Sequence, residues 1–346
     1  MIDKGFRIYN VDGVLVNEIP LATRDIYGAD RMMYHRQDLH DCLKEAARST
    51  ERDGPPVTIK TSSRVLSCDC KAGTIKLKSG EEICADLIIG ADGIHSTIRS
   101  HVLDERVSPV RTGLSAYRMM ISSDLLEERA LDFCRNINPR EAYTSMLVAH
   151  QCRLIMGPAR EGSLYSIVGL VPDEMMHEPM DERQSWRSQG DLSKLLETYK
   201  DFPEWVKAPF KLAEDIGLWQ LRDIPPLQTW TKGRVILIGD AAHAMLPTQG
   251  QGASQAIEDA EALGAFFEGS TGTPSAEKIE SILQQVFRCR YERASLIQRY
   301  SRDAAKPATE KGSSEVKMRP DEFMEYNCSY KGAKDWEGQM SELTKV

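Results

Sequence analysis

One strand, loop and helix between residues 232 and 267 constrain the fold of this chain more than any other stretch. The four apolar residues 235–238 are short, β-branched and flanked by glycines, which predicts a buried strand. Gly239 and Asp240 end it, and a loop with Pro247 follows. A helix then begins, with apolar residues at three- and four-residue spacing on one face: Ala253, Ala256, Ile257, Ala260, Leu263 and Phe267.

The residue types at the ends of these elements indicate a chemistry. A carboxylate at a strand end accepts hydrogen bonds from hydroxyl groups, so Asp240 suits a ribose or ribityl chain. Gly250 and Gly252 precede the helix, whose first N–H groups and positive end favour an anion or an electron-rich ring edge. An ordinary strand–loop–helix without a ligand is the alternative interpretation.

Two earlier segments carry similar signals. Leu87, Ile88 and Ile89 predict a second short buried strand, followed by a tight turn with Asp92 and Gly93. Ser96 and Arg99 come next, near the start of a helical turn. Residues 34–47 predict an amphipathic helix with Arg36 at its leading edge, where a solvated charge is the alternative to a binding role.

These stretches resemble a known family. GDAAHAMLPTQGQGASQAIEDA, ADLIIGADGIHSTIR and the R-x-D-L pattern at Arg36 are similar to motifs of the FAD-dependent aromatic hydroxylases, the class A flavoprotein monooxygenases. Salicylate-hydroxylase-like enzymes and a secondary-metabolism subgroup of epoxidases and hydroxylases are the nearest subgroups. The resemblance implies FAD-binding roles for Arg36, Asp92, Gly93, Arg99, Gly239, Asp240, Pro247, Gly250, Gly252 and Ala253.

Residues 111–172 change character and predict several strands, where the family carries a mostly β substrate domain. By resemblance, Arg118 lies near the active site, and Tyr165 is a second catalytic candidate. A salt bridge within the sheet is the alternative for Arg118, and a half-buried strand residue is the alternative for Tyr165. Tyr143 is a weaker rival for the phenolic role, and His243 is interpreted as structural.

The expected fold is α/β: a split, Rossmann-like FAD-binding domain with an inserted, mostly β substrate domain and C-terminal helices. We expect a partial FAD-binding domain over 1–110, a substrate domain over 111–228, the FAD-binding strand, loop and helix over 229–270, and a helix and tail over 271–346. The sequence contains no G-x-G-x-x-G, so the family's first βαβ unit is expected to be missing by N-terminal truncation.

The resemblance implies a monooxygenase that uses O₂, FAD and NADH or NADPH to hydroxylate or epoxidise a small hydrophobic organic substrate, aromatic or terpenoid-like. The alternatives are a non-catalytic fragment that cannot retain FAD, a binding module that keeps the substrate pocket, and a reductase of isoprenoid chains. A G-x-G-x-x-G upstream would favour the enzyme, and substrate binding without flavin would favour the module.

Composition excludes other classes. The net charge of −8 argues against nucleic acid as a partner, and no apolar run is long enough to span a membrane. The N-terminus carries no signal-peptide pattern, and the eight cysteines form no CxxC pair, so no metal site is expected. Free thiols and a cytoplasmic location follow, although longer relatives of the subgroup carry membrane anchors.

Overall fold

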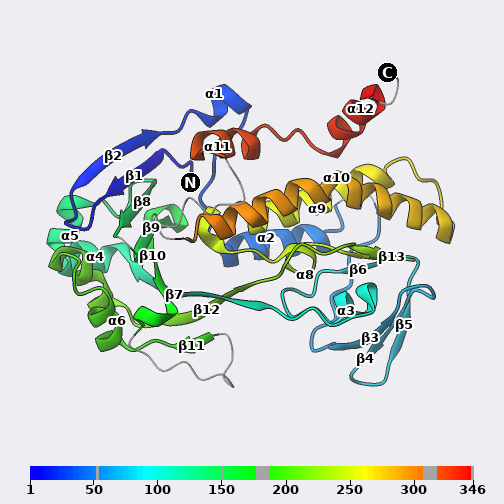
Figure 1. Cartoon of the computed structure of the whole chain (residues 1–346), viewed down its shortest axis with the longest axis horizontal. Coiled ribbons are helices and arrows are strands. Elements are labelled where there is room, and N and C mark those ends of the chain that lie inside the picture. The colour runs from blue at the N-terminus through cyan, green and yellow to red at the C-terminus, as the bar shows by residue number, and fades with distance from the viewer. Residues whose placement is uncertain (52–53, 150, 177–186, 307–317, 344–346) are drawn as a thin grey trace. The chain divides into compact units, whose positions relative to one another are not determined.

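The computed structural model describes residues 1–51, 54–149, 151–176, 187–306 and 318–343 (Figure 1). By its internal contacts the chain divides into two compact units. The first contains Met1–Ile59 and Gly113–Leu221, and the second contains Lys60–Thr112 and Arg222–Val346. The chain passes from one unit to the other after Ile59, and again within two strands, β7 (Val110–Ser122) and β12 (Gly217–Asp223).

The first unit is built on an eight-stranded sheet with the order β11-β12-β7-β10-β9-β8-β1-β2. Its other strands are β1 (Gly5–Tyr9), β2 (Leu15–Pro20), β8 (Tyr143–Val148), β9 (Arg153–Ala159), β10 (Leu164–Pro172) and β11 (Arg187–Gln189). β1 and β2 form a hairpin, and Gly13 in the connection between them has a positive φ of 76°, which favours glycine. β1 also pairs in parallel with β8.

The core of this unit lies on one face of the sheet. Along β7, Tyr117, Met119 and Ile121 are buried whereas Arg118 and Met120 are exposed, the period of two expected for a strand with one covered face. The helices of the unit are α1 (Thr23–Tyr27), α2 (Arg36–Arg48), α4 (Ser123–Arg129), α5 (Leu131–Asn136), α6 (Leu192–Thr198) and α7 (Glu204–Lys207), with 3-10 turns at Arg160–Gly162, Asp173–Met175 and Ala208–Leu212.

The second unit has two small sheets. One has the order β13-β14-β6, and the other is an antiparallel meander of β3, β4 and β5. The bounds are β3 (Val65–Asp69), β4 (Thr74–Leu77), β5 (Glu82–Cys84), β6 (Ile88–Gly90), β13 (Thr231–Lys232) and β14 (Val235–Leu237). Its helices are α3 (Ile98–Leu103), α8 (Asp240–His243), α9 (Gly252–Phe267), α10 (Ala276–Asp303), α11 (Pro320–Cys328) and α12 (Ala333–Leu343). α9 and α10 lie side by side (Figure 1).

The α/β fold class is confirmed, but the units divide the chain differently from the predicted segments. Residues 1–59 group with 113–221 because β1 pairs along its whole length with β8, so the opening hairpin belongs to the large sheet. The functional assignment of the four segments stays a prediction. Residues 150, 177–186, 307–317 and 344–346, which fall in the predicted substrate domain and tail, lie outside the described residues.

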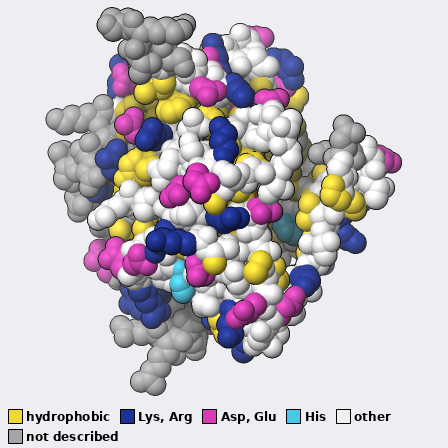
Figure 2. All heavy atoms as spheres, turned by 90° about the vertical axis from the view of Figure 1, so that its right-hand side faces the viewer, with side chains coloured by type: hydrophobic (Ala, Val, Ile, Leu, Met, Phe, Trp, Pro, Cys, Tyr) yellow, Lys and Arg dark blue, Asp and Glu magenta, His cyan; other side chains and the backbone are white. Residues whose placement is uncertain are grey.

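The surface seen in Figure 2 mixes charges of both signs. Lysine and arginine side chains alternate there with aspartate and glutamate, and apolar side chains lie scattered among them. None of the helices in the described part of the chain is long and apolar enough to cross a membrane.

Candidate functional site

Two of the predicted motifs meet at one edge of the small β13-β14-β6 sheet in the second unit. β14 pairs in parallel with β6, with Leu237 opposite Gly90, and the Ile238 N–H donates to the Gly90 carbonyl at 3.1 Å. The turn after β6 carries Asp92 and the turn after β14 carries Asp240. Both carboxylates therefore lie at the carboxyl ends of neighbouring parallel strands, the edge where α/β sheets bind ligands.

Gly239 determines how the chain leaves β14. Its φ of 56° and ψ of −141° lie in a region that only glycine adopts readily. The short helix α8 begins directly afterwards with Asp240. The Asp240 side chain is exposed and makes no hydrogen bond or ion pair within the part of the chain that the structure describes. This carboxylate is available to a ligand.

Asp92 has a local task. Its carboxylate accepts hydrogen bonds from the Ser96 hydroxyl at 2.5 Å and from the N–H groups of Thr97 and Ile98 at 2.7 and 3.1 Å. These bonds satisfy donors at the start of α3. Gly93 has a φ of 78°, so the turn itself requires a glycine at this position. The structure thus places Asp92 and Gly93 beside the Asp240 turn, with the Asp92 carboxylate partly used by the protein.

Arg99 lies inside the unit. Arg99 is only 1% exposed. Its guanidinium donates hydrogen bonds to the backbone carbonyls of Ala241, Ile94 and Val107 at 3.1, 2.6 and 3.2 Å. Burial lowers the pKa of Arg99. The contact with Ala241 ties the turn after β6 to α8, so Arg99 braces the two turns, and its contact with FAD stays a prediction.

The loop before α9 leaves room for a ligand. A 3-10 turn, Pro247–Gln249, leads into Gly250, whose φ is 65° and whose α-carbon has open space where a side chain would stand. α9 begins at Gly252 without a side-chain cap, and Ala253 is exposed in its first turn. Uncapped N–H groups at a helix N-terminus suit an anionic or electron-rich partner. Pro247, Gly250, Gly252 and Ala253 are therefore brought together.

A buried charged cluster supports the turn at Gly239 and was not predicted as part of the site. Asp259 of α9 accepts hydrogen bonds from the Gly239 N–H at 2.9 Å, His243 Nε2 at 2.7 Å and Arg290 Nε at 3.0 Å. The structural interpretation of His243 agrees with this placement, because the imidazole is buried against Asp259. The apolar face predicted for α9 is not its buried face: Ala253, Ile257 and Ala260 are exposed, whereas Gln255, Asp259, Ala262 and Leu263 are buried. The apolar spacing in the sequence therefore gave no signal for Asp259.

In the first unit, the structure does not bring Arg118 and Tyr165 together. Arg118 of β7 lies opposite Val168 and points away from the core, whereas Tyr165 of β10 lies opposite Ile121 and points into it. Paired residues on neighbouring strands face the same side of the sheet, and successive residues alternate. Tyr165 lies three positions before Val168, the partner of Arg118, and so faces the opposite side. A catalytic pair of these two side chains is not supported by this placement.

Tyr165 is a core residue. It is 1% exposed, its ring packs edge-on against Phe133 with centroids 5.6 Å apart, and burial raises the pKa of its phenol. No group among the described residues offers its hydroxyl a hydrogen bond of good geometry. The half-buried alternative considered from the sequence underestimated this burial, because the sequence does not reveal which face of the sheet α5 covers.

Arg118 remains on the open face. Its guanidinium stands over the Trp219 ring, 5.3 Å from the centroid. The pKa of Arg118 is lowered mainly by partial desolvation, and to a smaller extent by the positive charge of Arg36. Arg36 is exposed at the first residue of α2, and its contact with FAD stays a prediction.

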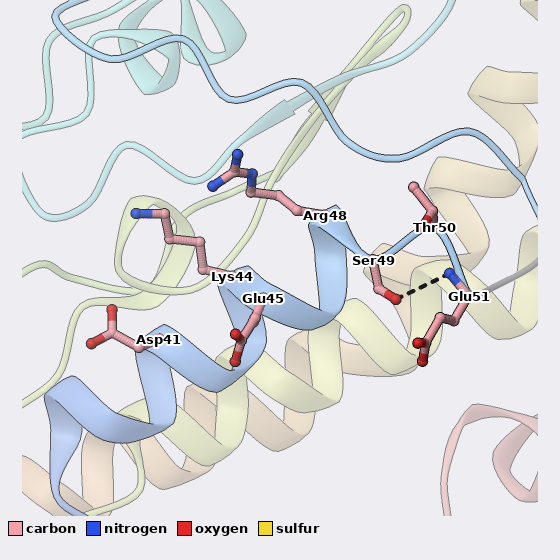
Figure 3. A pocket seen from close by; sticks show the side chains of 7 residues that line it. All are labelled: Asp41, Lys44, Glu45, Arg48, Ser49, Thr50 and Glu51. Carbon is pink, nitrogen blue, oxygen red and sulfur yellow. Dashed lines mark hydrogen bonds between the residues drawn. The ribbon is translucent and has the colours of Figure 1, made fainter.

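A hollow along the last turns of α2 holds none of the predicted site residues. It is lined by Asp41, Lys44, Glu45, Arg48, Ser49, Thr50 and Glu51 (Figure 3). Side chains of this kind on an exposed helix do not form the mostly apolar, concave pocket that small organic substrates occupy. We assign it no function.

Comparison with known proteins decides the family. A family model described as "FAD binding domain" matches residues 28–279, most of the chain. The chain belongs to this FAD-binding family. The similarity to FAD-dependent hydroxylases expected from the motifs is confirmed at this level, and FAD is the cofactor of the family.

The relatives in this FAD-binding family are monooxygenases and hydroxylases. The chain is 34% identical to hispidin-3-hydroxylase of Neonothopanus nambi over 79% of its own length and 66% of that protein. It is 32% identical to a FAD-dependent monooxygenase of Aspergillus candidus over 80% of its length and 64% of that protein. The chain thus spans about two thirds of these curated relatives.

Solved structures agree with the fold. A salicylate hydroxylase substrate complex is 27% identical, with a TM-score of 0.73 over 99% of this chain and 80% of that one. The protein CtdE in complex with FAD and a substrate has a TM-score of 0.77 at 20% identity, covering 100% of this chain and 83% of that one. The second likeness shows the fold alone.

Proposed function

We propose that this chain binds FAD at the carboxyl ends of β6 and β14 and acts as a monooxygenase on a small hydrophobic organic molecule. O₂ is the oxygen source, and NADH or NADPH is the hydride donor. One observation carries the proposal: the exposed Asp240 carboxylate, the Asp92 turn and the uncapped start of α9 lie in one unit around two parallel strand ends. FAD has hydroxyls, phosphates and an electron-rich ring edge that match these groups.

The residues present fit that cofactor. Asp240 accepts hydrogen bonds from ribityl or ribose hydroxyls, because its carboxylate is unoccupied by other side chains of the described region. The open space at Gly250 and the exposed Ala253 let the first N–H groups of α9 approach the flavin ring. Bound FAD supplies the oxygen-activating chemistry, whereas the protein holds it, orients the substrate and excludes water.

The test is a titration with FAD followed by visible absorbance and flavin fluorescence. Removing a charged hydrogen-bond acceptor costs roughly 1.5–3 kcal/mol, so Asp240→Ala is expected to raise the Kd for FAD at least about tenfold. Asp86→Ala is the matched control, because Asp86 is an exposed carboxylate before β6, paired only weakly with Arg234 at 3.5 Å. Equal effects of both substitutions would contradict the proposed site.

Arg118 is the residue that we propose orients the substrate. It faces away from the core, beside an aromatic ring, on the sheet of the first unit. Salicylate and hispidin are the first probes, because relatives carry these names. Arg118→Gln is expected to raise KM for an accepted substrate while the Kd for FAD stays unchanged. An unchanged KM would show that Arg118 does not orient the substrate.

A second candidate function is a chain that cannot retain FAD by itself. Exposed apolar positions favour it: Ile89 in β6 is 44% exposed, and β6 lies at the edge of its sheet as far as the described residues show. α2 has no buried residue, although its apolar side chains fall on one face. A colourless protein that shows no saturable FAD binding in the same titration would support this candidate.

A further inference from the structure

Asp259 makes an unusual set of contacts for a residue in the interior. It is 0% exposed, and its two carboxylate oxygens face three donors on three different elements. Oδ2 accepts from the Gly239 N–H and from His243, and Oδ1 accepts from Arg290 of α10. One side chain of α9 thereby connects the end of β14, α8 and α10.

Packing two helices together does not require these charges. A buried ion pair costs desolvation, and apolar residues of similar volume hold helices at least as well. α9 and α10 already share apolar contacts, with Leu263 and Leu283 in one cluster. The contact that an apolar side chain cannot replace is the one from Asp259 to the backbone N–H of Gly239, since this N–H needs an acceptor when it is buried.

The network is closed around that contact. Arg290 also donates to Gln255 Oε1 at 2.7 Å and forms an ion pair with Glu258 at 2.6 Å, and Arg293 donates to Glu258 at 2.8 Å. Burial alone would raise the pKa of Asp259, but His243, Arg290 and the Gly239 N–H lower it below its ordinary value. The carboxylate is therefore charged at neutral pH, and His243 and Arg290 hold it in place.

We propose that Asp259 is the positioning residue that fixes the Gly239 turn and so sets the direction of the Asp240 carboxylate. As a glycine, Gly239 can adopt many backbone conformations, and the hydrogen bond from its N–H to Asp259 is what selects the one observed. Asp240 follows at once, so any rotation at Gly239 moves its carboxylate. The part of this inference that concerns FAD rests on the proposed function.

Amide hydrogen exchange of the purified chain tests the positioning itself. In Asp259→Asn, we expect exchange at Gly239 to be at least about tenfold faster than in the wild type, because the turn opens locally. Glu258→Gln is the matched control: it removes a neighbouring carboxylate that pairs with the same Arg290 but does not touch Gly239. Its exchange at Gly239 is expected to stay within about twofold of wild type.

Asp259→Glu covers the case in which Asp259→Asn does not fold. It keeps the negative charge beside Arg290 and displaces the carboxylate by one methylene, so faster exchange at Gly239 is again expected. Unchanged exchange at Gly239 in a folded Asp259 variant, or an equal acceleration in Glu258→Gln, would overturn the proposal and leave Asp259 a core residue only.

The FAD titration separates this inference from the proposed function. Asp259→Asn is expected to raise the Kd for FAD about tenfold, whereas Glu258→Gln leaves it within about twofold. If the wild-type chain binds no FAD, the proposed function fails for this chain while exchange at Gly239 still decides the positioning. If exchange at Gly239 accelerates but the Kd is unchanged, Asp259 orders the turn without serving the cofactor, and that part of the inference is wrong.

Discussion

Both units have apolar cores, but buried charged side chains are concentrated in the second. The first unit packs aromatic rings, with Tyr117, Phe133 and Tyr199 fully buried, and the charged side chains buried in its described part are Asp3 and Lys207. In the second unit, the buried side chains include Arg99, His243, Asp223, Asp259, Arg290, Arg293 and Asp303.

The difference follows from how the buried backbone groups of each unit obtain their hydrogen-bond partners. In the first unit the backbone is a ladder of long strands that satisfies its own hydrogen bonds, so the core needs only apolar volume. In the second unit short strands end in turns whose N–H and C=O groups lack ladder partners. Arg99 and Asp259 supply these partners, and both lie next to the candidate cofactor site.

The largest expected effect comes from removing the cation of the buried network. Arg290→Met leaves Asp259 and Glu258 without their shared partner, and breaking a buried pair costs about 3–5 kcal/mol. Thermal unfolding, with hydrogen exchange in α9 and α10 as the local probe, measures this loss. Arg160→Met is the comparison in the first unit, where the Asp38 pair is exposed, and it is expected to lower Tm far less. Similar losses would remove the distinction between the units.

A smaller effect is expected at Gly239. An alanine at a φ of 56° and a ψ of −141° costs about 1–3 kcal/mol, and its Cβ would stand 3.3 Å from that of Ala256. Gly264→Ala is the control within α9, where a Cβ meets nothing within 4 Å. A helix interior gains about 0.5–1 kcal/mol from that change. Urea unfolding of both variants checks the opposite signs.

The aromatic core predicts a still smaller effect at Tyr165. Its hydroxyl is buried without a partner of good geometry among the described residues, so Tyr165→Phe is expected to change the free energy of unfolding by less than about 1 kcal/mol. Tyr199→Phe is the matched variant, because the Tyr199 hydroxyl donates to the Leu170 carbonyl at 3.2 Å, and it is expected to lose about 1 kcal/mol. A large loss of turnover in a stable Tyr165→Phe would restore a catalytic role for that phenol.

The contrast also explains what the sequence could predict. The strand before Asp240 and the helix after Gly252 follow from local apolar patterns, and both are present close to the expected bounds. The parallel pairing of β6 with β14 is non-local, and the sequence analysis did not predict it. Arg99 was predicted to bind the cofactor because its place within the motif can be read from the sequence. The three carbonyl groups to which it donates could not be identified from the sequence.

The faces of the large sheet show the same limit. The alternation along β7 is visible in the sequence, but the register that places Tyr165 opposite Ile121 depends on pairing between strands 44 residues apart. A shift of one residue would have put Tyr165 on the face of Arg118. Asp259 was overlooked for a related reason, because it shares its buried helix face with the polar Gln255, and its role depends on contacts with Gly239 and Arg290.

The smallest effect on stability is expected from the exposed Arg160–Asp38 ion pair in the first unit. The pH dependence of Asp38 ionisation is the most sensitive way to detect this pair. Asp38 accepts hydrogen bonds from Arg160 Nε and a terminal nitrogen at 2.9 and 2.6 Å, which lowers the pKa of Asp38 to about 2, with His35 contributing second. Since the folded pKa lies below the ordinary value of about 3.9, the stabilisation is present above that value and disappears as pH falls toward 2.

An NMR titration of the Asp38 carboxyl carbon measures this directly. The wild-type midpoint is expected near 2, and Arg160→Met is expected to return it toward about 3.9, because the two strongest hydrogen bonds to the carboxylate are lost. Added salt should shift the wild-type midpoint upward, since exposed charges are screened. Asp259, buried behind Gly239, should resist the same salt. A wild-type Asp38 midpoint near 4 would show that the exposed pair does not persist in solution, and the two units would then differ even more in how they use charge.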